Sequence, residues 1–335
     1  MKKIMNAAEK LVDEMLEGIV LAHSDRVKLS AENNRVVLNA HPMKEGKVGI
    51  VTAGGSGHLP VFLGYVGDGM LDGCAVGNVF ASPSASAMAA MIRACDRGAG
   101  VLCLYGNYNG DKLNFNMACE EVAFDDIKTR TVLVKDDVAS SPPENADKRR
   151  GVAGMVYAFK VAGAAAMKGL DLEGVAAAAQ MALDNARTMG VALSACIVPE
   201  AGKATFGIGE DEIEIGMGIH GEPGIEVRKM MTADEIADLM VEKIAADMPL
   251  AKGDEVTVMV NGLGATPLEE QYIVYRRVHR ILADRGVAVC APHIGEFATS
   301  MEMAGLSVTI MKLNDTLKQF LNAPAVTPFY TNANK

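Results

Sequence analysis

Residues 47–60 read Lys-Val-Gly-Ile-Val-Thr-Ala-Gly-Gly-Ser-Gly-His-Leu-Pro, and this stretch indicates the fold class. Its first part, Lys47–Thr52, predicts a buried strand. The strand runs into the turn Ala53–Pro60, whose glycines let a ligand approach the backbone without Cβ atoms in the way. The turn lacks the lysine of a Walker A loop and the spacing of a dinucleotide fingerprint, so it does not predict a nucleotide site. Its unusual feature is His58, a titratable group beside backbone donors.

A second strand and turn repeat this pattern. Val101–Tyr105 predicts a buried strand that leads into Gly106–Asp111, and a helix is expected over Lys112–Ala123. Asp111 fits two roles, the N-cap of that helix or a catalytic carboxylate. In open α/β sheets, ligands bind beyond the carboxyl ends of the strands, where both His58 and Asp111 are expected.

A third stretch, Ile213–Gly224, reads Ile-Glu-Ile-Gly-Met-Gly-Ile-His-Gly-Glu-Pro-Gly. Its first part alternates in the manner of an extended strand, and His220 stands where the strand stops. The following turn leaves room for a small molecule to reach the imidazole ring. An ordinary surface histidine beside turn residues is the alternative.

Composition limits the class of protein. The chain has 335 residues, enough for two domains, and half of them are apolar. A net charge of −10 argues against a nucleic-acid surface and fits a protein that acts on a small molecule. The six cysteines lie far apart without a C-x-x-C pair, which favours reduced thiols in a cytoplasmic protein. No run approaches the roughly 18 apolar residues of a membrane span, and no signal peptide is indicated.

Strands and helices alternate along the whole chain, which predicts two α/β domains. Two alanine-rich helices are expected at Val152–Lys168 and Leu172–Thr188, followed by a strand at Ala192–Val198. The boundary is therefore expected between an N-terminal domain, residues 1–188, and a C-terminal domain, residues 189–335, which carries His220. The polar run Ser140–Gly151 predicts a loop or lid. Helix N-caps are expected at Ser82 or Ser84 and at Thr232.

Five motifs together carry a family resemblance. They are Gly-Gly-Ser-Gly-His-x-Pro, Gly-Tyr-Val-Gly-x-Gly-Met-Leu-Asp, Val-Phe-Ala-Ser-Pro, Asn-Tyr-x-Gly-Asp-x-x-Asn-Phe and Gly-Ile-His-Gly-Glu-Pro-Gly. In this order, they resemble the K subunit of the dihydroxyacetone kinase family, the half that binds substrate. The resemblance covers nearly the whole chain. It implies a homodimer of two-domain α/β chains with the active site between the domains.

The resemblance also implies an unusual mode of capture, in which the histidine matched by His220 attacks the substrate ketone and forms a covalent hemiaminal. A neutral imidazole can do this near pH 7, because its unperturbed pKa is about 6.5. His58 and Asp111 would flank the terminal hydroxyl, with Asp111 as general base and His58 orienting it or sharing the proton. Glu222 either positions the His220 loop or is a solvated carboxylate.

Substrate contacts are expected from Gly55, Ser56 and Gly57, whose backbone groups would hold hydroxyls, and at Gly106. Two positions depart from the family pattern. Leu59 replaces the more usual glutamate, and Gly106 replaces a lysine. Loss of the lysine removes a donor and opens space, so a longer or branched ketose such as erythrulose or apulose competes with dihydroxyacetone as the expected substrate.

The resemblance places the nucleotide elsewhere. No nucleotide motif or metal site is expected in this chain, so ADP or ATP with magnesium is expected on a separate L subunit. Both ATP and a phosphotransferase-system relay are compatible with the sequence as the source of the phosphate. The alternative function is a K-like regulatory protein that senses the ketose and binds a transcription factor without catalysis.

Overall fold

The computed structural model describes residues 2–333 and divides the chain into two compact units. The first unit comprises the chain up to Val134, Val156–Ala182 and the chain from Leu317 onward. The second comprises Lys135–Met155 and Leu183–Thr316. The sequence predicts a single boundary, between residues 188 and 189. In the structure the chain passes between the units at 134/135, 155/156, 182/183 and 316/317.

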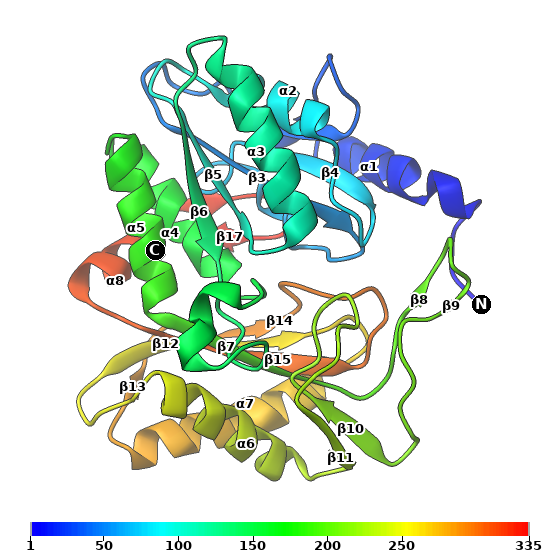
Figure 1. Ribbon diagram of the computed structural model, residues 1–335. Coiled ribbons are helices and arrows are strands. Elements are labelled where there is room, and N and C mark those ends of the chain that lie inside the picture. The colour runs from blue at the N-terminus through cyan, green and yellow to red at the C-terminus, as the bar shows by residue number, and fades with distance from the viewer. Residues whose placement is uncertain (1, 334–335) are drawn as a thin grey trace. The chain divides into compact units, whose positions relative to one another are not determined.

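A six-stranded mixed sheet forms the centre of the first unit (Figure 1). In spatial order its strands are β1 (Val27–Leu29), β2 (Val36–Asn39), β4 (Gly73–Val79), β3 (Gly49–Ser56), β5 (Val101–Gly106) and β6 (Thr129–Val134). Strands β4, β3, β5 and β6 pair in parallel, whereas β1 and β2 pair antiparallel at one edge. The central strands are continuous apolar runs, as expected where a parallel sheet is buried on both faces.

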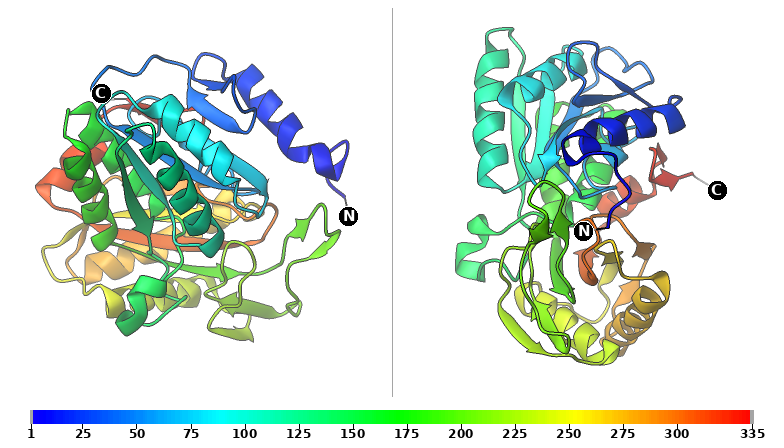
Figure 2. Two further views of the ribbon diagram at one scale, coloured as in Figure 1. Left: turned by 45° about the horizontal axis from the view of Figure 1, so that its top comes forward. Right: turned by 90° about the vertical axis from the view of Figure 1, so that its right-hand side faces the viewer.

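The helices of the first unit are α1 (Leu11–Ala22), α2 (Ala85–Cys95), α3 (Asn109–Ala123), α4 (Met155–Met167), α5 (Leu172–Asp184) and α8 (Asp315–Asn322), with short 3₁₀ turns at Ala8–Lys10 and Leu63–Tyr65. Figures 1 and 2 show α2 and α3 side by side over the sheet. Met88, Met91 and Phe115 pack from these helices against the sheet in one core. Ser84 caps α2 by accepting a hydrogen bond from the Ala87 amide, as predicted.

A second sheet, mainly antiparallel, forms the centre of the other unit. Its strands run in the order β11 (Glu226–Lys229), β10 (Glu212–Ile215), β7 (Ala186–Ala192), β15 (Gly305–Lys312), β12 (Glu255–Gly262) and β13 (Ala288–Val289), and β14 (His293–Gly295) also pairs with β12. Only β13 and β14 pair in parallel with β12. Helices α6 (Ala233–Asp247) and α7 (Leu268–Asp284) lie together against one face of the sheet (Figure 1). Thr232 caps α6 in a capping box, as predicted.

The remaining elements are a 3₁₀ helix at Pro143–Lys148 and two small hairpins, β8 (Ile197–Val198) with β9 (Lys203–Ala204), and β16 (Ala325–Val326) with β17 (Thr331–Asn332). The α/β class predicted from the sequence is confirmed. Within residues 2–333, no helix has the length and apolar character needed to cross a membrane.

The strand β7 lies earlier in the chain than predicted. Helix α5 ends at Asp184, and residues 186–192 form β7, whereas the sequence predicted a helix to Thr188 and a strand over Ala192–Val198. Seven residues of β7 pair with β15, and the Thr188 hydroxyl lies 2.8 Å from the Thr309 hydroxyl. This pairing overrides the helical tendency of the alanine-rich segment, because propensity is weaker than tertiary context.

The C-terminal segment belongs to the first unit and not to the domain that the sequence assigned it to. The buried ammonium of Lys160 on α4 donates to the Phe320 carbonyl at 2.7 Å, and burial lowers the pKa of Lys160 to about 8. The Thr327 hydroxyl donates to the Gly64 carbonyl at 2.8 Å. These buried hydrogen bonds fasten residues far apart in the sequence.

A buried charge cluster fixes the segment 135–155 within the second unit. Arg149, only 2% exposed, donates through both terminal nitrogens to the Asp247 carboxylate at 2.5 and 2.9 Å. Arg187 donates to the same carboxylate at 2.5 Å. Asp247 is the last residue of α6, so one carboxylate joins three segments.

Asp247→Asn is expected to lower the free energy of unfolding by about 3 kcal/mol, because it removes the buried negative charge that Arg149 and Arg187 both contact. Urea unfolding followed by far-ultraviolet circular dichroism measures this. Asp238→Asn, on the same helix, is the control. It loses only a half-exposed pair with Arg277 and should cost less than about 1 kcal/mol. Equal losses in both variants would show that burial of the Arg149 pair does not matter.

Candidate active site

The turn after β3 holds His58 in a fixed position. Its side chain is 1% exposed and stacks on the ring of Phe80, with ring centroids 4.8 Å apart, while Phe62 contacts it edge-on at 6.0 Å. Both phenylalanines have positive φ, 57° at Phe80 and 72° at Phe62. Such backbone is strained for bulky residues and tends to occur at functional sites. Two strained positions therefore hold one imidazole.

The three predicted contact residues of this turn lie directly before His58. Gly57 has φ of 97°, which a residue with a Cβ rarely adopts. A Cβ at Gly55 would lie 2.7 Å from the Ala81 amide nitrogen, so the backbone here is packed closely. The Ser56 hydroxyl is buried and donates to the Gly77 carbonyl at 2.7 Å. Ser56 thus joins this turn to β4.

Asp111 lies in the first turn of α3 and is 8% exposed. It is not the N-cap of that helix, as one of its two sequence interpretations held, because Tyr108 occupies that position. The N-terminal turn of a helix stabilises negative charge through its backbone dipoles. A buried carboxylate at this place suits a base. The alternative interpretation of Asp111, as the N-cap of α3, is not supported.

Strand topology brings the His58 and Asp111 turns to the same edge of the sheet. Strands β3 and β5 are parallel neighbours, with Gly49 opposite Val101. Because their carboxyl ends point the same way, the turns that follow them meet at one edge. Gly106 is the last residue of β5 and is buried. The first unit therefore gathers His58, Asp111 and Gly106 at the edge where the sequence predicted ligand contacts.

His220 lies in the second unit, on a loop of residues 216–224 that follows β10. Three main-chain hydrogen bonds close this loop on itself and on its neighbours: Gly218 N to Glu222 O, Gly221 N to Gly218 O, and Gly216 N to Gly190 O. The Ser300 hydroxyl donates to the Ile219 carbonyl at 2.5 Å. His220 therefore stands on an ordered loop, with 24% of its side chain exposed.

Glu222 binds His220 through both carboxylate oxygens. The His220 amide donates to Oε2 at 3.0 Å, and the ring Nδ1 lies 2.9 Å from Oε1. Burial would raise the pKa of Glu222, but hydrogen bonds and charge attraction from His220, with backbone hydrogen bonds, outweigh it and lower that pKa to about 2. An ionised carboxylate only accepts hydrogen bonds, so Nδ1 carries the proton and the lone pair of a neutral ring is on Nε2.

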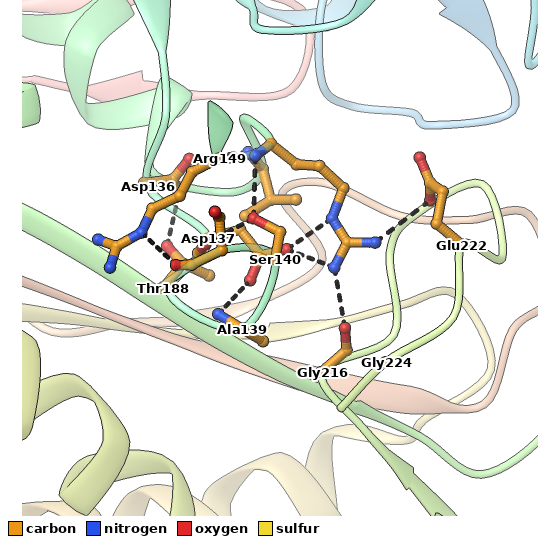
Figure 3. Close-up of polar contacts among 12 residues, drawn as sticks. Asp136, Asp137, Ala139, Ser140, Arg149, Thr188, Gly216, Glu222 and Gly224 are labelled. Atoms are coloured by element: carbon orange, nitrogen blue, oxygen red, sulfur yellow. Dashed lines mark hydrogen bonds and ion pairs between the residues drawn. The ribbon is translucent and has the colours of Figure 1, made fainter. Parts of the chain in front are cut away.

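Polar contacts continue from Glu222 into the segment around residues 136–150 (Figure 3). Asp137 receives hydrogen bonds from the Arg150 side chain and the Ala139 amide, at 2.9 and 3.0 Å. Burial raises the pKa of Asp137 to about 6, although Arg150 acts to lower it. The sequence predicted only a loop or lid over residues 140–151, and Asp137 and Arg150 carry no local signal that links them to residue 222.

The predicted site residues thus form two groups, one in each unit. His58, Asp111 and the glycine positions belong to the first unit, and His220 with Glu222 belongs to the second. The arrangement offers a nucleophilic nitrogen in one group and a buried carboxylate with an imidazole in the other. Among residues 2–333, no group of three or more histidine, cysteine, aspartate or glutamate side chains is placed to hold a metal ion.

Relatives with similar sequences are named as ketose kinases or as their subunits. The chain is 45% identical over 330 residues to the dihydroxyacetone-binding subunit DhaK of a PTS-dependent dihydroxyacetone kinase of Listeria innocua, covering 98% of this chain and 99% of that protein. It is 42% identical to a D-erythrulose kinase of Mycolicibacterium smegmatis, covering 98% of this chain and 56% of that protein. The phosphotransferase class predicted from the sequence is therefore confirmed by relatives named as kinases.

Solved structures agree with these names. The dihydroxyacetone kinase of C. freundii superposes with a TM-score of 0.90 at 31% identity, covering 99% of this chain and 60% of that one. A dihydroxyacetone kinase operon co-activator, DhaQ, superposes with a TM-score of 0.89 at 33% identity, covering 96% and 98%. The Dak1 domain matches residues 17–329. By sequence and by fold, the chain belongs to the dihydroxyacetone kinase family.

Proposed function

We propose that this chain is the substrate-binding subunit of a ketose kinase and that His220 captures the ketose as a covalent hemiaminal. The contact of Glu222 with His220 carries this proposal. It keeps the proton on Nδ1 and the lone pair on Nε2, which is the state of an imidazole nucleophile. The ordered loop around it limits the motion of the ring, so less entropy is lost when the adduct forms.

The atoms, electrons and protons of the capture step can be accounted for without a cofactor. The Nε2 lone pair forms a bond to the ketone carbon, and the carbonyl π electrons move to the oxygen, which takes up a proton. The positive charge that develops on the ring is met by the Glu222 carboxylate, 2.9 Å from Nδ1. Loss of the Nδ1 proton to that carboxylate or to solvent leaves a neutral adduct. Glycerol has no carbonyl and is excluded from this step.

Phosphoryl transfer would then use the groups of the first unit. Asp111 accepts the proton of the terminal hydroxyl as it attacks phosphorus, and His58 orients that hydroxyl or shares the proton. Gly55, Ser56, Gly57 and Gly106 line the position of the substrate. The burial of Asp111 and its place at a helix N-terminus support this role.

The phosphate donor is proposed to lie on a separate L subunit that carries ADP or ATP with magnesium, and the K chain is proposed to act as a homodimer. The Listeria relative, which matches over its whole length, is named PTS-dependent, and this favours a phosphotransferase-system relay over ATP. Both dihydroxyacetone and erythrulose occur in the names of relatives, so both remain candidate substrates alongside apulose. The glycine at position 106 favours the larger ketoses.

A ketose-sensing regulator is the second candidate function. The similarity to the co-activator DhaQ over almost the full length of both chains favours it. A regulator would need His220 for capture but no base. Buried His58 and Asp111 at the edge of the first sheet support the kinase instead.

His220→Asn is expected to abolish the ketose adduct, because no ring nitrogen remains to form the bond. Intact-protein mass spectrometry under native conditions measures this after incubation with dihydroxyacetone, erythrulose, apulose or glycerol. His279→Asn, an exposed histidine of α7 in the same unit, is the control and should keep the adduct. An adduct that persists in His220→Asn, or one that forms with glycerol, would refute covalent capture at this residue.

Asp111→Asn is expected to keep the adduct but to lower turnover at least about 100-fold, because the amide cannot accept the hydroxyl proton. Turnover is measured with an L subunit and its phosphate donor. Asp125→Asn removes an exposed aspartate just beyond α3 and should leave turnover unchanged. Unchanged turnover in Asp111→Asn would remove this residue from the mechanism. Capture without any turnover in the unaltered protein would favour the regulator.

Glu222→Ala is expected to shift the neutral His220 ring toward the tautomer protonated on Nε2. Side-chain ¹⁵N spectra of histidine-labelled protein at about pH 8, above the usual imidazole pKa, report the protonation of each ring nitrogen, and His220→Asn assigns the signals. The unaltered protein should show Nδ1 protonated. The same tautomer in Glu222→Ala would mean that this carboxylate does not set it.

A further inference from the structure

One arginine, Arg150, contacts both the loop that carries His220 and the Glu222 carboxylate, and it also pairs with Asp137. The Arg150 side chain donates to the Gly216 carbonyl at 2.9 Å, where the loop begins, and to Asp137 at 2.9 Å. Its Nη1 lies 4.0 Å from Oε2 of Glu222. Figure 3 shows Glu222 and Gly216 joined to the same guanidinium group. Arg150 thus reaches both the start of the loop and the carboxylate that contacts the ring.

The guanidinium has little freedom to leave this place. Its side chain is 13% exposed, and that of Asp137 is 5% exposed. The backbone of Arg150 is held as well, because its amide donates to Ser140 Oγ at 3.0 Å and its carbonyl accepts from the Asp137 amide at 3.2 Å. Because both the side chain and the backbone of Arg150 are held by hydrogen bonds, the guanidinium group has a fixed orientation.

Gly218 shows that the two side chains come together at one point of the loop. A Cβ at this position would lie 2.1 Å from Oε2 of Glu222 and 2.4 Å from Nη1 of Arg150. Both distances are far below any real carbon contact. The loop therefore leaves out a side chain where the carboxylate and the guanidinium approach each other.

We propose that Arg150 is a positioning residue. It orients the nucleophile His220 by acting through Glu222, and this inference rests on the proposed function. The guanidinium draws Oε2 toward itself and toward the loop backbone. This orientation leaves Oε1 facing the ring Nδ1. Without Arg150 the carboxylate would have no cation on that side and could turn to other donors, so the tautomer and the direction of the ring would both be less well defined.

Two variants separate positioning from simple stabilisation. Arg150→Gln and Asp137→Asn both break the buried ion pair, but only Arg150→Gln removes the cation beside Glu222. Arg150→Gln is expected to slow adduct formation about tenfold and to change the ¹⁵N signals of the His220 ring. Asp137→Asn keeps one oxygen that can accept from Arg150 Nε, and the cation stays beside Gly216 and Glu222, so adduct formation should stay within about twofold of the unaltered protein. Equal effects in both variants would overturn the proposal.

A double-mutant cycle tests the route through Glu222. In a Glu222→Gln background, Arg150→Gln should slow adduct formation by less than about twofold further, because the group it acts through is already lost. Full additivity of the two changes would overturn the route. Arg150→Lys keeps the positive charge but loses the planar, forked donor geometry of the guanidinium. Compared with Arg150→Gln, it is expected to recover part of the rate of adduct formation and part of the ¹⁵N signal of the His220 ring.

Folding is checked in every variant by circular dichroism and urea unfolding. Arg150→Gln leaves Asp137 as a buried charge without its arginine. If that variant does not fold, the double variant Asp137→Asn/Arg150→Gln, which is neutral at both positions, is used in its place. The rate of adduct formation is again expected to fall about tenfold. Failure of the proposed function can be told apart from failure of the Arg150 proposal, because without ketose capture the unaltered protein itself would form no adduct. The ¹⁵N signals of His220 would still respond to Arg150→Gln if Arg150 positions the ring, and unchanged signals would overturn the proposal.

Discussion

Two adjacent arginines, Arg149 buried and Arg150 largely buried, fix the arrangement of the second unit, because each guanidinium must find a carboxylate when it leaves water. Arg149 pairs with Asp247 at the end of α6, and Arg150 pairs with Asp137. Their side chains serve different parts of the unit. One fastens the segment to the helical layer, and the other contacts the loop that carries His220. A short connecting segment thus becomes part of the support of a candidate nucleophile.

The predictions that succeeded rest on local chemistry. The glycine turn after β3 and the Gly-Asn-Tyr turn after β5 were recognised because glycine permits backbone that other residues avoid. Their meeting at one sheet edge follows from the parallel pairing of neighbouring strands. His220 was predicted from the end of a strand and a Gly-rich turn, and its role in capture is a proposal. The contact of Glu222 with His220 resolves an alternative that the sequence left open, since two residues of spacing permit contact without requiring it.

The predictions that failed rest on long-range pairing. Residues 186–188 continue an alanine-rich helical pattern, and their pairing with β15, more than a hundred residues later, makes them a strand. The repeated passage of the chain between units has the same cause. Phe320 meets Lys160 across 160 positions in sequence, and no local pattern predicts such a contact. Arg150 was missed for this reason too, because it contacts Gly216 from 66 positions away.

The division of candidate groups between the units bears on how one fold serves two functions. His220, Glu222 and Arg150 belong to the second unit, whereas His58 and Asp111 belong to the first. Under the proposed mechanism, capture of a ketone draws on the second set, and proton removal draws on the first. The two sets belong to different units, so substitutions in one need not disturb the other. Under this mechanism, a chain with this fold can lose phosphoryl transfer and keep capture; a protein named as an operon co-activator shares the fold at 33% identity.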